Sequence, residues 1–147
     1  MPLGALSRRQ VLDNLASILT GVGSASEAVK IDVTTGPQGR AHEYFSFTSI
    51  SDTPDEWRGR PGGKLGQRYR LRVTYAYRIS PHAQGDSRRG ALDAIDNIQR
   101  ALQNDTSSSV SEMEVHWLGS DEVQSPSQEW LLYQLNIEAH ALFDFAA

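Results

Sequence analysis

Apolar and polar side chains alternate along residues 68–79 of this chain. The apolar positions are Tyr69, Leu71, Val73, Tyr75, Tyr77 and Ile79, and the polar positions between them include Arg68, Arg70, Arg72, Thr74 and Arg78. Successive side chains of a β-strand point to opposite faces of the sheet, so this pattern predicts a strand with one apolar face. A chain with such a strand must fold around a sheet whose other face is at least partly polar.

Three further segments read as strands. Residues 43–50 are rich in aromatic and β-branched side chains, residues 112–118 alternate, and residues 130–143 form a long terminal alternation. In the terminal segment, one face would carry Leu131, Tyr133, Leu135, Ile137, Ala139, Ala141 and Phe143, and the other Gln134, Asn136, Glu138 and His140. A shorter alternation within residues 25–35 predicts a small additional strand.

Two segments have the spacing of amphipathic helices. Ser7 and Gln10 form a capping box, and the apolar stripe that follows predicts a helix ending near Gly21. A second helix is predicted from about Ser87 to Gln103, with its stripe at Leu92, Ile95, Ile98 and Leu102.

The order of these elements predicts an α+β fold. We expect a two-layer sandwich in which a mostly antiparallel sheet of four to five strands carries two helices on one face. The length of 147 residues fits a single domain, residues 1–147. The predicted core lies between the two layers and comprises Leu15, Ile18, Val73, Tyr75, Leu92, Ile95, Ile98, Val115, Leu135 and Ile137.

Residues 51–67 interrupt the pattern and predict a mobile loop or arm, because they hold four of the twelve glycines and two of the six prolines. Trp57 lies in the middle, among Arg58, Arg60 and Lys64, which is the composition of an interface hot spot. We therefore predict that this arm docks on a neighbouring protein. The alternative is that Trp57 folds back onto its own domain.

The residue types argue against several kinds of active site. The chain has no cysteine, and residues 59–65 lack the spacing and the following helix of a phosphate loop. The four histidines, His42, His82, His116 and His140, are dispersed along the chain, so we expect no metal site, although two of them fall on polar strand faces. No nucleophile elbow occurs. We expect no catalytic residues, no cofactor and no enzymatic activity.

The overall charge and the longest apolar runs bear on the partners of the chain. A formal net charge of −4 argues against general nucleic-acid binding. The pair Arg8-Arg9 resembles an export signal, but Asp13 and Asn14 break the apolar stretch that should follow, so an ordinary helix start is the interpretation. No run of about 18 apolar residues occurs, and we expect no membrane span.

Charges segregate between the predicted strands. Arg68, Arg70, Arg72 and Arg78 lie on one polar strand face, and Glu112, Glu114, Glu129 and Glu138 lie on the polar sides of the last two strands. If the strands share one sheet, these charges pair across it, each exposed pair contributing less than about 1 kcal/mol. Alternatively, the two strips meet between subunits of a head-to-tail ring. A third hypothesis, an arginine strip along a phosphate backbone, is disfavoured by the net charge.

The order of elements resembles that of the tail-terminator proteins of long-tailed bacteriophages, the lambda U-like and related tail-completion group. The resemblance rests on the first amphipathic helix, the arginine-bearing strand, the short helix Leu92–Leu102 and the terminal strand, and it is strongest over residues 128–139, QEWLLYQLNIEA. It covers most of the chain in architecture, and residues 51–67 have no counterpart in it.

The resemblance implies a structural virion protein that forms a hexameric ring, caps the tail tube, stops its polymerisation and joins it to the head connector. Its implied partners are further copies of itself, the tail tube protein and a head–tail connector or neck protein, with genome DNA passing through the ring lumen without sequence-specific binding. The implied location is the virion tail or neck, after assembly in the host cytoplasm. Candidate contacts between subunits or with the tube are Trp57, Arg58, Arg60, Lys64, Arg68, Arg70, Arg72, Arg78, Glu112, Glu114 and Glu138. The alternatives are another head–tail connector or neck protein, and a small α+β ligand-binding or catalytic domain.

Overall fold

The computed structural model of the protein describes residues 5–22, 25–54, 63–79, 84–104 and 113–145. Within these ranges the elements are α1 (Arg8–Gly21), β1 (Ser26–Glu27), β2 (Glu43–Pro54), β3 (Lys64–Arg78), α2 (Gln84–Asn104), β4 (Glu114–Val123) and β5 (Trp130–Asp144). The strands form one sheet in the order β1-β2-β3-β5-β4. β1 runs parallel to β2, and the other neighbouring pairs are antiparallel.

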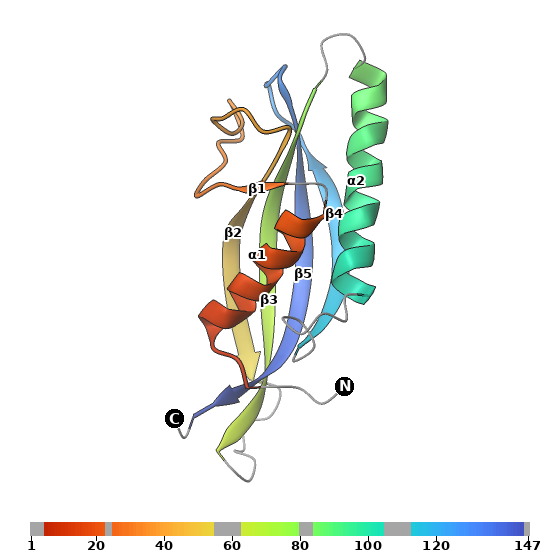
Figure 1. The fold of residues 1–147 in the computed structure, drawn as a ribbon. Helices are drawn as coiled ribbons and strands as arrows, with labels where there is room; N and C mark the ends of the chain where they lie inside the picture. The colour runs from red at the N-terminus through yellow and green to blue at the C-terminus, as the bar shows by residue number, and fades with distance from the viewer. Residues whose placement is uncertain (1–4, 23–24, 55–62, 80–83, 105–112, 146–147) are drawn as a thin grey trace.

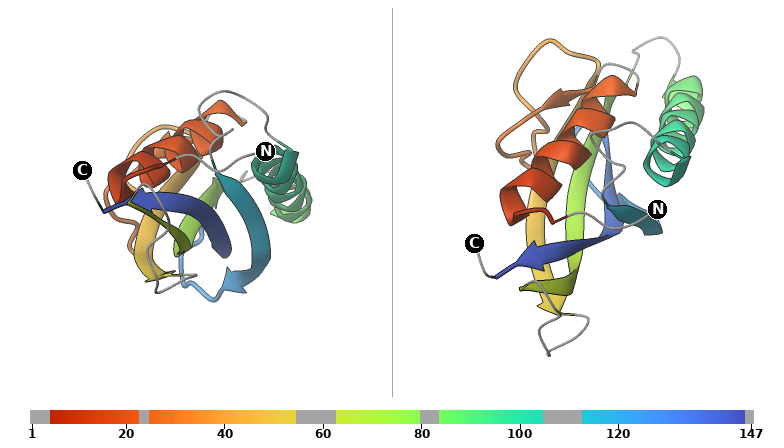
Figure 2. Two further views of the ribbon diagram at one scale, coloured as in Figure 1. Left: turned by 90° about the horizontal axis from the view of Figure 1, so that it is seen from below. Right: turned by 60° about the horizontal axis from the view of Figure 1, so that its bottom comes forward.

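Both helices lie on the same face of the sheet (Figures 1 and 2). We call this side the inner face and the opposite side the outer face. The predicted two-layer α+β sandwich is confirmed, with a sheet that is mixed because of the short parallel strand β1.

The inner face holds the main core. Apolar side chains of β3 and β5 meet the stripe of α1, which buries Val11, Leu15, Ile18 and Leu19. The predicted capping box is present, because the backbone N–H of Gln10 donates to Ser7 Oγ at 3.2 Å and the Gln10 side chain accepts from the Ser7 backbone at 2.8 Å. Helix α1 ends at Gly21, as predicted.

Helix α2 corrects one predicted core position. It buries Ala91, Ile95, Ile98 and Leu102, which are spaced by four, three and four residues and therefore share one face. Leu92 is 49% exposed, because it lies one residue, or about 100°, away from that face. The predicted stripe was right from Ile95 onward and wrong at its first member.

The structure also corrects the predicted irregular segment at residues 51–67. Strand β2 continues to Pro54 and β3 begins at Lys64, with Pro54 paired opposite Gln67. Here β2 borders no strand but β3 among the described residues, and proline is tolerated in such an edge strand. Trp57, Arg58 and Arg60 fall in residues 55–62, which lie outside the described ranges.

The predicted strand within residues 25–35 is reduced to β1, and Val29 is fully exposed. Residues 28–42 instead follow an irregular path between β1 and β2 (Figure 1). At the other side of the sheet, β4 begins at Glu114 and extends to Val123, five residues beyond its predicted end at Leu118, and Glu112 lies outside the described ranges. In the described part of the chain, neither helix has the length and apolar character required to cross a membrane.

Candidate functional site

The outer face of the sheet divides into two ends with different chemistry. At one end, where β2 and β5 begin and β3 finishes, residues 28–42 cover the sheet; we call this the covered end. At the other end, charged side chains of β3, β4 and β5 project from the strands; we call this the open end. β3 and β5 run through both ends, since Arg78 pairs opposite Trp130 and Arg70 pairs opposite Glu138.

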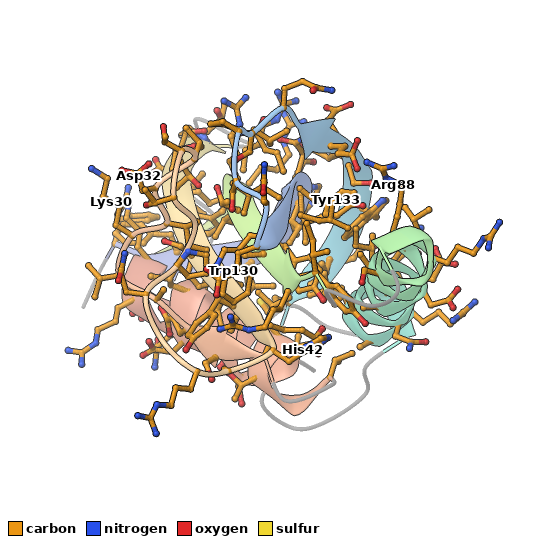
Figure 3. The ribbon with its side chains drawn as sticks, turned by 90° about the horizontal axis from the view of Figure 1, so that it is seen from above. Lys30, Asp32, His42, Arg88, Trp130 and Tyr133 are labelled. Atoms are coloured by element: carbon orange, nitrogen blue, oxygen red, sulfur yellow. The ribbon has the colours of Figure 1, made fainter. Side chains whose placement is uncertain are left out.

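The covered end is a second, small apolar cluster. Ile31 of the covering segment packs with Ala76, Trp130 and Leu132 of the sheet, and Trp130 is only 2% exposed. Figure 3 looks onto this end, with Trp130 near the centre, Lys30 and Asp32 to one side, and Tyr133 and Arg88 to the other. This cluster explains why two large apolar side chains of β5 point away from the helices.

A tight turn shapes the covering segment. The Asp32 carboxylate accepts from the backbone N–H of Thr34 at 2.7 Å, a hydrogen bond that lowers the pKa of this carboxyl. Gly36 has φ of +79°, and a Cβ there would lie 2.2 Å from Cδ1 of Trp130. The turn therefore requires glycine both for its backbone conformation and for its close approach to the ring.

Arg78 holds the end of the covering segment in place. Its guanidinium lies 4.2 Å from the ring centroid of Trp130 and donates to the Glu129 carboxylate at 2.5 Å. It also donates to the backbone carbonyl of Gly39 at 2.8 Å. Arg78 is one of the predicted assembly contacts. In the structure its guanidinium is bound within the subunit, by Glu129, Gly39 and Trp130.

The open end carries the two most exposed arginines of β3. Arg70 pairs with Glu138 across the sheet at 3.1 Å, so the predicted cross-strand pairing of opposite charges is confirmed for this pair and for Arg78–Glu129. Arg72 is exposed and faces Ser49 on β2 and Asn136 on β5, neither of which carries a charge. Arg70, Arg72, Ser49, Ser51, Leu118 and Asn136 line a shallow hollow of about 430 Å³.

The same end brings together side chains that are far apart in the sequence. His116 and His140 have ring centroids 5.0 Å apart, and Glu114 lies 3.6 Å from His116 between Oε1 and Nε2. Glu138 Oε1 is 2.7 Å from His140 Nε2; this hydrogen bond, and then the Arg70 contact, lower the pKa of the Glu138 carboxyl. The histidines are dispersed along the sequence, and only the β4–β5 register brings these two together.

The remaining predicted site residues lie near the open end or outside the described ranges. Lys64 is the first residue of β3 and pairs opposite Asp144 at the far end of β5. Arg68 is partly buried and pairs opposite His140. Trp57, Arg58, Arg60 and Glu112 lie outside the described ranges.

A polar cluster at the edge of the inner face was not predicted. Arg88 of α2 donates to Glu122 at 3.0 Å, and Tyr133 donates to the same carboxylate at 3.3 Å. Tyr75 donates to Glu43, and burial together with this hydrogen bond raises the pKa of the Tyr75 hydroxyl far above its ordinary value. The Arg88 contact ties α2 to β4, and the Tyr75 contact links β3 to the first residue of β2. The pKa values of both tyrosines are raised, mainly by burial, so both remain protonated at neutral pH.

The two edges of the sheet bear on how copies of the chain can associate. β4 forms one edge, and at the opposite side β1 pairs only with Tyr44 and Phe45 of β2. Within the described residues, the later part of β2, Thr48–Pro54, therefore has β3 on one side and no strand on the other. Such edges present backbone N–H and C=O groups to which another chain can pair.

Comparisons with known proteins bear on the fold. No protein-family model matches the sequence, and no curated protein matches it. A solved structure with a similar fold is the sheath/tube terminator of an extracellular contractile injection system, PVC, determined by cryo-EM in the extended state. The identity is 11%, the TM-score is 0.56, and the match covers 99% of this chain and 59% of that chain. At this identity the likeness shows a shared fold, and this chain spans less than two thirds of its neighbour.

Proposed function

We propose that this protein is a tail-terminator subunit: copies of it form a ring on the end of a tail tube and stop the tube's polymerisation. The observation that carries this proposal is the fold, which matches a sheath/tube terminator over 99% of the chain. The resemblance to phage tail-completion proteins, found in the order of elements, supports the same role. The proposed partners are further copies of the chain, the tube protein and a head–tail connector or neck protein, and the proposed place of action is the virion tail.

The sheet edges support a head-to-tail ring. If the Thr48–Pro54 edge of one subunit meets β4 of the next, the contact uses two different surfaces, and such a contact closes into a ring when the rotation between subunits permits. Backbone pairing between the edges would supply hydrogen bonds. Six copies per ring is the number that the family resemblance implies.

Opposite charges near the two edges would orient one subunit relative to the next. Arg72 lies on β3, one strand in from the Thr48–Pro54 edge, and Glu114 and Asp121 are exposed on β4 at the opposite edge. Complementary charge of this kind fixes register and disfavours wrong pairings. Arg72 is a better candidate than Arg70 for the contact between subunits, because Arg70 already pairs with Glu138 in its own subunit.

The segment between β2 and β3 completes the proposal. Its composition, with Trp57 beside Arg58 and Arg60, supports a contact with the tube or with the neighbouring subunit. Replacement of residues 55–62 by a short Gly-Ser linker should keep the β2–β3 pairing, which extends to Pro54 and Gln67. The same deletion should abolish capping.

The proposed function is tested by removing the gene from its tail gene cluster and returning it as wild type or variant. We expect tubes of uncontrolled length without the gene, normal length with the wild type, and uncontrolled length with the 55–62 deletion or with Arg72→Glu. Arg9→Glu is the control. Arg9 is an exposed residue of α1, so reversal of its charge should leave capping intact. Tubes of normal length in the absence of the gene would overturn the proposal.

A further inference from the structure

The pairing of β4 with β5 brings four side chains to one corner of the open end. Glu114 lies opposite His140, and His116 lies opposite Glu138. Side chains at alternate positions of a strand share a face, so all four project from the outer face. Imidazole nitrogens and carboxylate oxygens are both ligands of Zn²⁺ and related ions.

Three of these side chains are close enough to share one ion. One ligand atom from each of Glu114, His116 and His140 lies within 4.8 Å of the other two. Around a tetrahedral Zn²⁺ with bonds of about 2.0–2.1 Å, neighbouring ligand atoms lie about 3.4 Å apart. The separation of 3.6 Å between Glu114 and His116 already approaches this value, and rotation of the exposed side chains can close the rest.

The fourth side chain orients one of the three. Glu138 is hydrogen-bonded to His140 at 2.7 Å and is itself held by Arg70 at 3.1 Å. Metal-binding imidazoles generally donate their second ring N–H to such a carboxylate, which fixes the orientation of the ring. Because an imidazole has two nitrogens, His140 can bind an ion through one and keep the bond to Glu138 through the other.

We propose that Glu114, His116 and His140 form a binding site for a divalent transition-metal ion, best matched by Zn²⁺, and that Glu138 is its positioning residue. Two imidazoles favour such an ion over Mg²⁺ or Ca²⁺, which prefer oxygen ligands. Three protein ligands leave the fourth position to water, and Glu114 and His116 are 61% and 46% exposed in their side chains. The bound ion joins the first residues of the edge strand β4 to β5.

The test is a calorimetric titration of ZnCl₂ into the full-length chain, without a histidine tag and after treatment with a chelator. We expect one equivalent to bind, and His116→Ala and His140→Ala each to weaken binding at least about tenfold. His42→Ala is the matched control, because His42 packs against Tyr77, which borders the main core on the inner face, and it should leave the affinity unchanged.

Two further measurements keep the test decisive. Co²⁺ in place of Zn²⁺ should give the visible absorption of a four-coordinate site, and His116→Ala should abolish it. Glu114→Gln alters an exposed side chain and provides a folded variant if a histidine variant does not fold. Absence of saturable binding, or binding that His116→Ala and Glu114→Gln both leave unchanged, would overturn the proposal.

Discussion

The covered end and the open end of the outer face share β3 and β5 but use them differently. At the covered end β5 is buried on both sides, because Trp130 and Leu132 lie under residues 28–42 while Tyr133 faces the inner core. At the open end the outer positions of the same strand are polar, as at Asn136 and His140. One strand therefore changes from two-sided to one-sided burial along its length.

This difference determines how much each end contributes to stability. Burial of a large aromatic side chain stabilises the fold by several kcal/mol, roughly 3–5 by truncation, whereas an exposed ion pair contributes less than about 1 kcal/mol. The covered end is completed within the subunit, since Arg78 is used to hold the covering segment. At the open end Arg70 is paired with Glu138 within the subunit, and the exposed side chain of Arg72 faces no charged residue on the two flanking strands at its paired positions.

The largest effect is expected from Trp130→Ala at the covered end. The ring is 2% exposed and contacts Arg78 and Tyr44, so its removal should lower the free energy of unfolding by about 3–5 kcal/mol. Urea denaturation measures the loss. A loss below about 1 kcal/mol would mean that the covering segment does not stabilise the sheet.

The second-largest loss of stability is expected from a substitution in the turn that packs against the Trp130 ring. Gly36→Ala places a methyl group 2.2 Å from Trp130 at positive φ and should destabilise by roughly 1–3 kcal/mol. Gly21→Ala, at the end of α1, is the matched control: no atom of the described residues lies within 4 Å of the added group, and the variant should be neutral or slightly stabilising. Equal thermal stability of the two variants would contradict the proposed packing of the turn.

Charge reversal at the open end should affect assembly more than folding. Arg72→Glu changes an exposed side chain, so we expect the free energy of unfolding to stay within about 0.5 kcal/mol of the wild type. Self-association, measured by analytical ultracentrifugation at low and at high salt, should fall and lose its salt dependence. A variant that associates like the wild type would remove Arg72 from the interface.

The smallest effect sets the scale for a single exposed ion pair. Asp52 accepts hydrogen bonds from Arg8, and this contact lowers the pKa of the Asp52 carboxyl. The pair therefore stabilises the fold above the ordinary carboxyl pKa, and the contribution is lost as the pH falls through the lowered value. Asp52→Asn should cost less than about 1 kcal/mol near neutral pH and nothing at the lowest pH. A cost that does not change with pH would exclude the ion pair as its cause.

Much of the fold could be predicted from alternation and helical periodicity. The inner face of β5, the stripe of α1 and its capping box depend on neighbours in the sequence, and each was predicted correctly. The outward-facing cluster at Trp130 was not predicted, because its cover comes from an irregular segment a hundred residues away. Leu92 was misplaced because Ala91, a small residue, occupies the buried position.

The candidate sites were less predictable for a similar reason. The sequence leaves three hypotheses open for the strips of arginines and glutamates, because the pairing of Arg70 with Glu138 depends on the β3–β5 register. The meeting of His116 with His140 depends on how β4 aligns with β5 before the bulge between Trp117 and Gly119. No local residue pattern specifies that alignment, whereas tertiary pairing does.

Whether this chain terminates a tail tube as a ring can be seen by cryo-EM of tube ends isolated from cells that express the complete tail gene cluster. The proposed function predicts one closed ring of this chain at one end of each tube, with β4 of each subunit next to the Thr48–Pro54 edge of its neighbour. Tubes of normal length whose ends carry no copy of the chain would contradict it.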